Sequence, residues 1–151
     1  MEDLVIQSNV CNLEKVEDYI WKVCESRNIS DYYGIISVPV IQAVKNSIEH
    51  GNQYDEKKDV HIVCNQTSNG LNVSVTDEGC GFEFSRYGSF PENNNDKHGI
   101  FLMRLLADNI SFIDGGRGVI MEFMLSGVDE ALSASRRHAL ENYSTKCYVS
   151  V

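Results

Sequence analysis

Two stretches near the middle of the chain place apolar residues at every second position. The first covers residues 60–65 and the second covers residues 71–76. An alternation of period two is typical of a β-strand that buries one face and exposes the other. Between the two stretches stands the pair Asn69-Gly70, which favours a tight turn between antiparallel strands. The pattern therefore predicts a β-hairpin.

Two stretches before this hairpin have the spacing of amphipathic helices. Apolar residues recur every three or four positions in residues 13–26, and Asn12 just before them can cap the helix N-terminus. A second helix is expected to start at Ser37, with Pro39 in its first turn and Gly51 as its end. Each helix would turn its apolar face toward a common core.

Further elements are expected on both sides of these. A short strand is predicted at residues 4–6, a buried helix at 100–107, and a last hairpin with strands at 110–113 and 119–125. The order is strand, two helices, two strands, helix, two strands. This order favours an α+β fold, a two-layer sandwich with helices on one face of a mixed or antiparallel sheet.

The domain organisation is simple. Residues 1–125 are predicted to form one domain, and residues 126–151 a C-terminal extension that is partly helical. Within the domain, the polar segment 83–97 predicts a long mobile loop, and such loops in compact domains are often lids. The weak apolar face of the extension suits self-association into a homodimer, binding to a partner, or packing on the domain itself.

The overall composition narrows the function classes. The chain has 151 residues, a net charge of −9 and 42% hydrophobic residues, which suits one globular domain with its own core. The acidic balance argues against direct binding to nucleic acid, because phosphate contacts rely on clustered Lys and Arg. No apolar run approaches the roughly 20 residues that span a bilayer, and the acidic start does not resemble a secretory signal. A cytoplasmic protein that does not bind membranes is expected.

Cysteine and histidine usage predicts no structural metal site. The five cysteines include no Cys-x-x-Cys pair, and the four histidines do not pair at metal-ligand spacing. Reduced and mostly buried thiols are the expected state of the cysteines.

Polar side chains in two other places suggest a nucleotide site. Asn46 lies on the second predicted helix, and its amide oxygen can hold a hard cation such as magnesium. Asp77 ends the second strand of the hairpin and can accept a proton from the amino group of adenine. Gly79 and Gly81 follow it at a spacing that lets backbone approach a ligand. Taken singly, such an asparagine is usually a surface residue and such a glycine-rich segment is usually a turn.

In order along the chain, these residues resemble the motifs of a known family. The motifs are Asn46 with His50-Gly51-Asn52, Asp77-x-Gly79-x-Gly81, His98-Gly99 and Gly118. They resemble the motifs of the GHKL-type ATPases, which share the Bergerat fold with gyrase, histidine kinases and MutL-type repair ATPases. The sequence of residues 43–51 looks most like the corresponding segment of the anti-sigma factor serine kinases.

The resemblance implies a role for each matching residue. Asn46 would hold magnesium, Asp77 would receive the adenine amino group, and Gly99 would present backbone N–H groups to phosphate. Segment 83–97 would be the lid over ATP. The expected nucleotide site is completed by Gly79, Gly81, His50, Lys97 and His98, of which the last three are also readily explained as ordinary helix-end or loop residues.

Three positions depart from the family pattern. Where the serine kinases have a glutamate as general base, this chain has Gln42, whose amide cannot take a proton at neutral pH. Lys97 replaces a glycine of the phosphate-binding turn, and Val119 replaces a residue that often carries a hydroxyl. Glu49 and Glu78 are the candidates for a substitute base.

Two functions therefore remain open. By resemblance, the protein is a serine kinase that binds ATP and magnesium, phosphorylates an anti-anti-sigma protein of the STAS type and sequesters a sigma factor. The alternative is a non-catalytic nucleotide-binding module that switches partners and lacks kinase activity because of Gln42. A fragment of a topoisomerase or chaperone ATPase fits poorly, since the chain contains no transducer domain.

Overall fold

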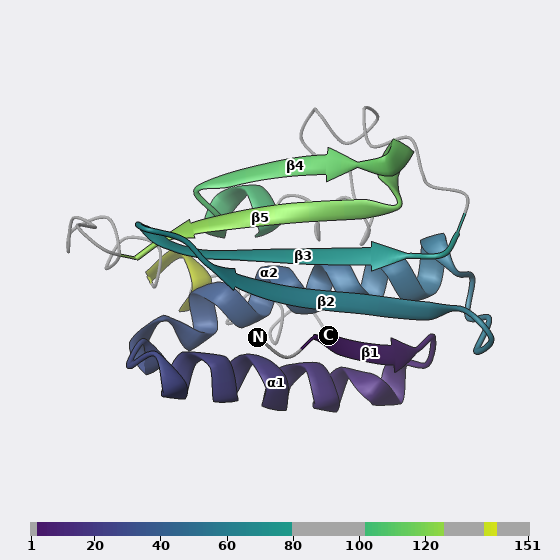
Figure 1. The fold of residues 1–151 in the computed structure, drawn as a ribbon, viewed down its shortest axis with the longest axis horizontal. Helices are drawn as coiled ribbons and strands as arrows, with labels where there is room; N and C mark the ends of the chain where they lie inside the picture. The colour runs from purple at the N-terminus through teal and green to yellow at the C-terminus, as the bar shows by residue number, and fades with distance from the viewer. Residues whose placement is uncertain (1–2, 80–101, 126–137, 142–151) are drawn as a thin grey trace.

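The protein folds as two layers, a five-stranded sheet with helices on one face (Figure 1). A computed structural model describes residues 3–79, 102–125 and 138–141. The strands are β1 (Leu4–Gln7), β2 (Asp59–Gln66), β3 (Gly70–Asp77), β4 (Asn109–Ile113) and β5 (Gly118–Met124). They pair in the order β1-β2-β3-β5-β4, and every pair is antiparallel. The predicted α+β sandwich is confirmed, with an antiparallel sheet.

The helical layer is built mainly from two 14-residue helices. The helical elements are η1 (Val10–Asn12), α1 (Leu13–Ser26), η2 (Ser30–Tyr32), α2 (Tyr33–Asn46), η3 (Ser47–Gly51) and η5 (Asp114–Gly116). Figure 1 shows α2 running behind the sheet, where it contacts β3 and β5, and α1 beside α2 at the β1 edge. Residues 102–106 are also helical, within the predicted helix at 100–107. No helix among the described residues is long and apolar enough to cross a membrane.

The core lies between the layers and follows the alternation of the strands. The inward positions of β2, β3 and β5 are buried: Val60, Ile62, Cys64, Leu71, Val73, Val75, Val119, Met121 and Phe123. The helices contribute Val16, Ile20, Ile36, Val40, Val44 and Ile48 from their facing sides. Asp77 occupies the next inward position of β3 after Val75, which explains why a carboxylate is buried at this point.

The second helix begins earlier than its sequence signals indicate. It was predicted to start at Ser37, but α2 starts at Tyr33 and holds Pro39 in its interior. Proline has no N–H to donate, so its place inside the helix costs one backbone hydrogen bond. Ile35 and Ile36 are 4% and 0% exposed, and burying them against the core offsets this cost. Tertiary packing therefore sets the start of α2.

The predicted cap of α1 is also wrong in detail. The Asn12 side chain makes no capping bond; its Nδ2 donates to the Gln7 carbonyl at 3.1 Å. The capping bond is made one element earlier: Asn9 caps the short helix η1, which precedes α1, by accepting from the Cys11 N–H at 2.9 Å.

The hairpin between β2 and β3 is confirmed, but its glycine has another purpose. Neither Asn69 nor Gly70 has the positive φ that a two-residue Asn-Gly turn requires. Gly70 instead pairs with Met124 of β5, and a Cβ on it would lie 1.9 Å from the Phe123 carbonyl oxygen. Gly70 therefore permits the close approach of β5. In the β4–β5 connection, by contrast, Gly115 and Gly116 do have positive φ, as a glycine-rich turn predicts.

Two sequence predictions fall largely outside the described residues. The predicted lid at 83–97 lies wholly outside them. Of the C-terminal extension, residues 138–141 are described and are helical. Leu140 packs against the core, and its Cδ2 would be 3.2 Å from a Cβ on Gly34 of α2. The contact is the one expected from packing on the domain itself, one of the three alternatives for the extension.

Asn52 joins three strands at the end of the sheet that carries Asp77. It is 1% exposed, and its Nδ2 donates to Ser8 Oγ at 2.8 Å and to the Asp59 carbonyl at 3.0 Å. Its Oδ1 accepts from the Glu78 N–H at 2.9 Å. Ser8 in turn donates to the Lys58 carbonyl at 2.6 Å. One buried amide thus ties the end of β1 to the start of β2 and the end of β3.

We predict that Asn52→Ala lowers the free energy of unfolding by about 2–4 kcal/mol, because it leaves buried backbone groups without partners. Chemical denaturation would measure the change. Asn65→Ala, at an exposed position of β2, is the matched control and should change stability by no more than about 0.5 kcal/mol. An equally small effect at Asn52 would show that the three bonds do not hold the strands together.

Candidate functional site

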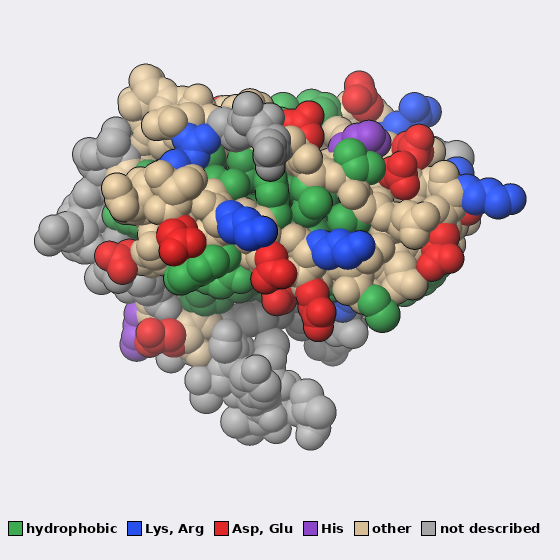
Figure 2. All heavy atoms as spheres, turned by 60° about the horizontal axis from the view of Figure 1, so that its bottom comes forward, with side chains coloured by type: hydrophobic (Ala, Val, Ile, Leu, Met, Phe, Trp, Pro, Cys, Tyr) green, Lys and Arg blue, Asp and Glu red, His purple; other side chains and the backbone are tan. Residues whose placement is uncertain are grey.

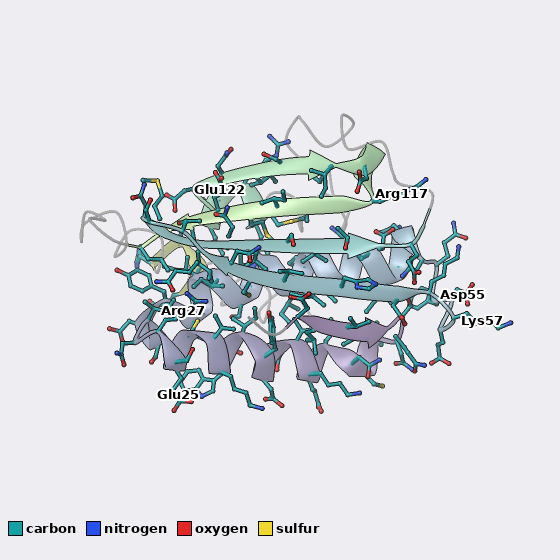
Figure 3. The ribbon with its side chains drawn as sticks, viewed as in Figure 1. Glu25, Arg27, Asp55, Lys57, Arg117 and Glu122 are labelled. Atoms are coloured by element: carbon teal, nitrogen blue, oxygen red, sulfur yellow. The ribbon has the colours of Figure 1, made fainter. Side chains whose placement is uncertain are left out.

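A pocket opens where α2 meets the β4–β5 turn. Its lining comes from α2, η3, three strands, the 102–106 helix and the turn: Ala43, Asn46, Ser47, Val75, Met103, Phe112, Gly116, Arg117, Gly118 and Val119. Most of these side chains are apolar, and Asn46 and Ser47 bring an amide and a hydroxyl. Figure 3 places Arg117 at the start of β5, at the end of the sheet where β3 finishes. The pocket therefore combines apolar walls with a few polar groups around a cavity of about 10 Å³.

Asp77 lies directly beside this pocket. Ser47 lines the pocket and also forms a side-chain hydrogen bond with the Asp77 carboxylate. Asp77 Oδ1 accepts from the Gly79 N–H at 2.8 Å, and the Asp77 N–H donates to the Arg117 carbonyl at 2.8 Å. The Gly79 N–H and the Ser47 hydroxyl thus orient the carboxylate, and the bond to Arg117 holds the backbone of Asp77.

The surroundings of Asp77 act on its charge in two directions. Burial raises the pKa of its carboxyl above the ordinary value. The Gly79 N–H, the Ser47 hydroxyl and the positive charges of Arg117 and Lys58 oppose this rise. A buried carboxylate with a raised pKa gains from a further hydrogen-bond donor, such as the amino group of a bound base.

Two glycines allow the backbone to close around Asp77. A Cβ on Gly51 would lie 2.3 Å from Asp77 Oδ2, and a Cβ on Gly79 would lie 1.9 Å from the Gly51 carbonyl oxygen. Neither glycine has a positive φ. Their role is therefore close packing between η3 and the segment after β3, and Gly51 is more than the helix stop that the sequence indicated.

The helix changes its winding at the candidate magnesium ligand. Asn46 is the last residue of α2, and residues Ser47–Gly51 continue as a π-helical turn. The Asn52 N–H donates to the Ser47 carbonyl at 2.7 Å, which closes the wider turn. Such turns are frequent at functional sites. Here the turn keeps Asn46 half-buried at the pocket and directs Ser47 toward Asp77.

His50 is placed differently from the other predicted ligand residues. It is exposed, and its Nε2 lies 3.9 Å from the Glu49 carboxylate. It does not belong to the residues that line the pocket. Its part in nucleotide binding stays a prediction, beside the alternative of an ordinary residue at the helix end.

Gln42 lines a different hollow from Asn46. It is half-buried, one helical turn before Asn46, and borders a groove between α1 and α2. The groove is also lined by Glu17, Tyr33, Ser37, Val38 and Ile41. The predicted base position and the predicted magnesium ligand thus share a helix and open on neighbouring surfaces.

Four predicted ligand residues lie outside the described residues: Gly81, Lys97, His98 and Gly99. Their part in the site stays a prediction. The structure adds two residues that the sequence pattern did not single out, Ser47 and Arg117. The hydroxyl of Ser47 directly follows Asn46 in the sequence, which could have marked it as a site residue. Its partner Asp77 lies thirty positions further along the chain, so the sequence alone does not show the contact.

The described residues offer groups whose chemistry suits an adenine nucleotide with magnesium. Asp77 supplies a buried acceptor, Val75, Met103 and Phe112 supply apolar walls, and Asn46 supplies an uncharged oxygen at the pocket. Asn46 would hold magnesium through its side-chain oxygen, and the ion would supply positive charge to the phosphates of the nucleotide.

Comparison with known proteins agrees with this geometry. A family model described as histidine kinase-like ATPase domain matches residues 30–123, a span that contains α2, the pocket and Asp77. A search of curated proteins finds no match. The described elements form the α+β arrangement consistent with that ATPase fold. Because the match covers more than half of the chain, the protein belongs to the histidine kinase-like ATPase domain family.

Proposed function

We propose that the protein is an ATP-binding regulator of the anti-sigma type, with magnesium as the cation bound alongside ATP. The observation that carries the proposal is that the family match spans a pocket lined by Asn46 and Ser47, with the buried carboxylate of Asp77 beside it. This arrangement supports the proposal, because Asp77 would serve as the acceptor for the base and Asn46 as the magnesium ligand.

Asp77 and Ser47 would select adenine. A carboxylate accepts from the exocyclic amino group of adenine, whereas guanine presents a carbonyl oxygen at the equivalent ring position. Ser47 would keep the carboxylate oriented and lower its pKa toward the charged form. Val119 has no hydroxyl, so Ser47 is the residue that offers one at this wall.

A serine kinase must bind ATP and also transfer its phosphate, and the described residues offer no evident general base for the transfer. Gln42 borders the groove between α1 and α2 and cannot act as a base. Glu78 is engaged elsewhere, since its carboxylate accepts from the Asp59 backbone N–H. Glu49 lies 4.0 Å from the Lys45 Nζ and 3.9 Å from the His50 Nε2. These placements favour the second candidate, a nucleotide-dependent partner switch without kinase activity.

The partners follow from the resemblance and stay proposals. The proposed partners are an anti-anti-sigma protein of the STAS type and a sigma factor. We also propose that the protein forms a homodimer and is located in the cytoplasm. Direct binding to nucleic acid is not proposed. On the face that Figure 2 shows, Lys and Arg side chains stand singly among Asp and Glu, in keeping with the net charge of −9.

We predict that Asp77→Asn weakens ATP binding by about tenfold or more, and GTP binding by less. Loss of a hydrogen bond to a charged acceptor costs about 1.5–3 kcal/mol. Calorimetric titration of wild type and variant with each nucleotide would measure the difference. Equal losses for ATP and GTP would contradict recognition of the adenine amino group by Asp77.

The Tm of Asp77→Asn shows whether a loss of ATP affinity comes from the binding site or from unfolding of the protein. Because burial raises the pKa of Asp77, the protonated carboxyl favours the fold below its ordinary pKa of 3.8, and this contribution is lost as the pH rises through the raised pKa. An asparagine carries no charge to bury, so Asp77→Asn should keep or raise the Tm at neutral pH. A lower Tm would assign the lost affinity to unfolding.

We predict that Ser47→Ala weakens ATP binding severalfold and raises the pKa of Asp77 further, because the hydroxyl that stabilises its charge is removed. Calorimetry over a range of pH would show the affinity falling more steeply toward acid than in wild type. Ser37→Ala is the control, since Ser37 is a buried serine of α2 that bonds to Tyr33 instead. If both variants behave alike, Ser47 has no special part in the site.

We predict that wild-type ATP hydrolysis is slow and that Gln42→Glu raises it, with ATP affinity nearly unchanged. A general base is typically worth about 10²–10⁴-fold, which sets the largest gain expected. Release of labelled phosphate would measure hydrolysis, and transfer to a STAS protein would measure kinase activity. Gln7→Glu, at an exposed position of β1, controls for added negative charge. Brisk wild-type phosphotransfer that Gln42→Glu does not change would contradict the switch without kinase activity.

A further inference from the structure

A second group of polar side chains lies on the face of the sheet opposite the helices. Asp59 and His61 alternate with Val60 and Ile62, which are fully buried in the core. Glu78 follows the inward-facing Asp77. Asp59, His61 and Glu78 therefore share the outer face, at the end of the sheet where β2 starts and β3 finishes (Figure 1).

The strand register brings these three side chains together. Val60 pairs with Asp77 in an antiparallel ladder, so Asp59 stands opposite Glu78 and His61 lies diagonally across from it. Each residue offers one ligand atom, and the three atoms all lie within 4.8 Å of one another. The Glu78 carboxylate also accepts a hydrogen bond from the Asp59 backbone N–H.

The backbone of Asp59 and Glu78 is hydrogen-bonded to a buried side chain under the sheet. The buried amide of Asn52 accepts from the Glu78 N–H at 2.9 Å and donates to the Asp59 carbonyl at 3.0 Å. This fixes the separation of the two chain segments. The side chains on the outer face then need only rotate to meet a common ligand, and His61 is exposed and free to do so.

The charges at this group are incompletely balanced. Among the described residues, no Lys or Arg side chain lies within 4.0 Å of the Asp59 or Glu78 carboxylate. Two carboxylates on directly opposite strand positions repel each other. A cation between them would convert this repulsion into attraction.

We propose that Asp59, His61 and Glu78 bind a divalent transition-metal ion, with zinc as the representative. An imidazole nitrogen beside two carboxylates suits zinc and its neighbours, whereas magnesium and calcium prefer oxygen ligands alone. Ligand atoms about 2.0–2.2 Å from a metal lie at most about 4.4 Å apart, so side-chain rotation suffices to close the site. Three protein ligands leave further positions for water.

This site is separate from the magnesium proposed at Asn46. Its ligands lie on the outer face, whereas Asn46 lines the pocket under the helices. Glu78 nevertheless stands between Asp77 and Gly79, so a metal bound here restrains the segment that carries the base acceptor.

Cysteine thiols are the main competing ligands for zinc. Cys24 and Cys64 are buried, and burial raises the pKa of both thiols to about 11, so they stay protonated and shielded. Cys11 is exposed. Cys80 and Cys147 lie outside the described residues. The metal titrations are therefore made on full-length protein carrying Cys11→Ser, Cys80→Ser and Cys147→Ser together, as well as on wild type.

The test is a calorimetric titration of zinc into nucleotide-free protein. One zinc per chain is expected, with an affinity at least about tenfold weaker in His61→Ala and in Glu78→Gln. Glu78→Gln keeps an acceptor for the Asp59 N–H, so its fold is preserved. His138→Ala removes an exposed histidine elsewhere and should leave the affinity unchanged.

Two further readouts decide the outcome. Cobalt bound in place of zinc should show a visible spectrum without a thiolate charge-transfer band, and saturating zinc should raise the Tm of wild type but not of His61→Ala. The proposal is overturned if millimolar zinc does not bind. It is equally overturned if zinc binds with unchanged affinity in His61→Ala and Glu78→Gln.

Discussion

The site depends on the contact between the π-helical turn after α2 and the segment after β3. Gly51 and Gly79 pack so closely that neither can carry a Cβ, and the carboxylate of Asp77 is enclosed between them. Asp77 reaches this position because it continues the inward alternation of β3. Ser47, brought inward by the same turn, then joins the carboxylate to the pocket. Without that contact the acceptor would be solvated and the pocket would lose its polar wall.

A buried asparagine also stabilises this end of the sheet. Asn52 follows the π-helical turn at once and bonds to groups at the ends of three strands. Its amide thus fixes the register of the strand ends on which both Asp77 and the outer group of Asp59, His61 and Glu78 stand. A buried polar network of this kind is stabilising only when every member is paired, and the described residues have no buried side-chain polar atom without a partner.

The sequence predicted what depends on local pattern. The alternation of the strands predicted the hairpin and the sheet, and ordered motifs predicted a site at Asn46 and Asp77. The start of α2 could not be predicted locally, because burial of Ile35 and Ile36 outweighs the signal of Pro39. Nor could the purpose of Gly70, whose close neighbour Phe123 lies on another strand. Ser47 and the outer group depend in the same way on partners that only the strand register brings near.

The account rests on one claim, that the pocket between Asn46 and Asp77 binds ATP. Amide NMR of the wild-type protein during titration with ATP and magnesium tests it directly. The account predicts saturable shifts that gather at Ser47, Asp77, Gly79 and Arg117, with weaker effects of GTP at Asp77. Unchanged spectra at millimolar ATP, or shifts confined to residues away from this pocket, would contradict it.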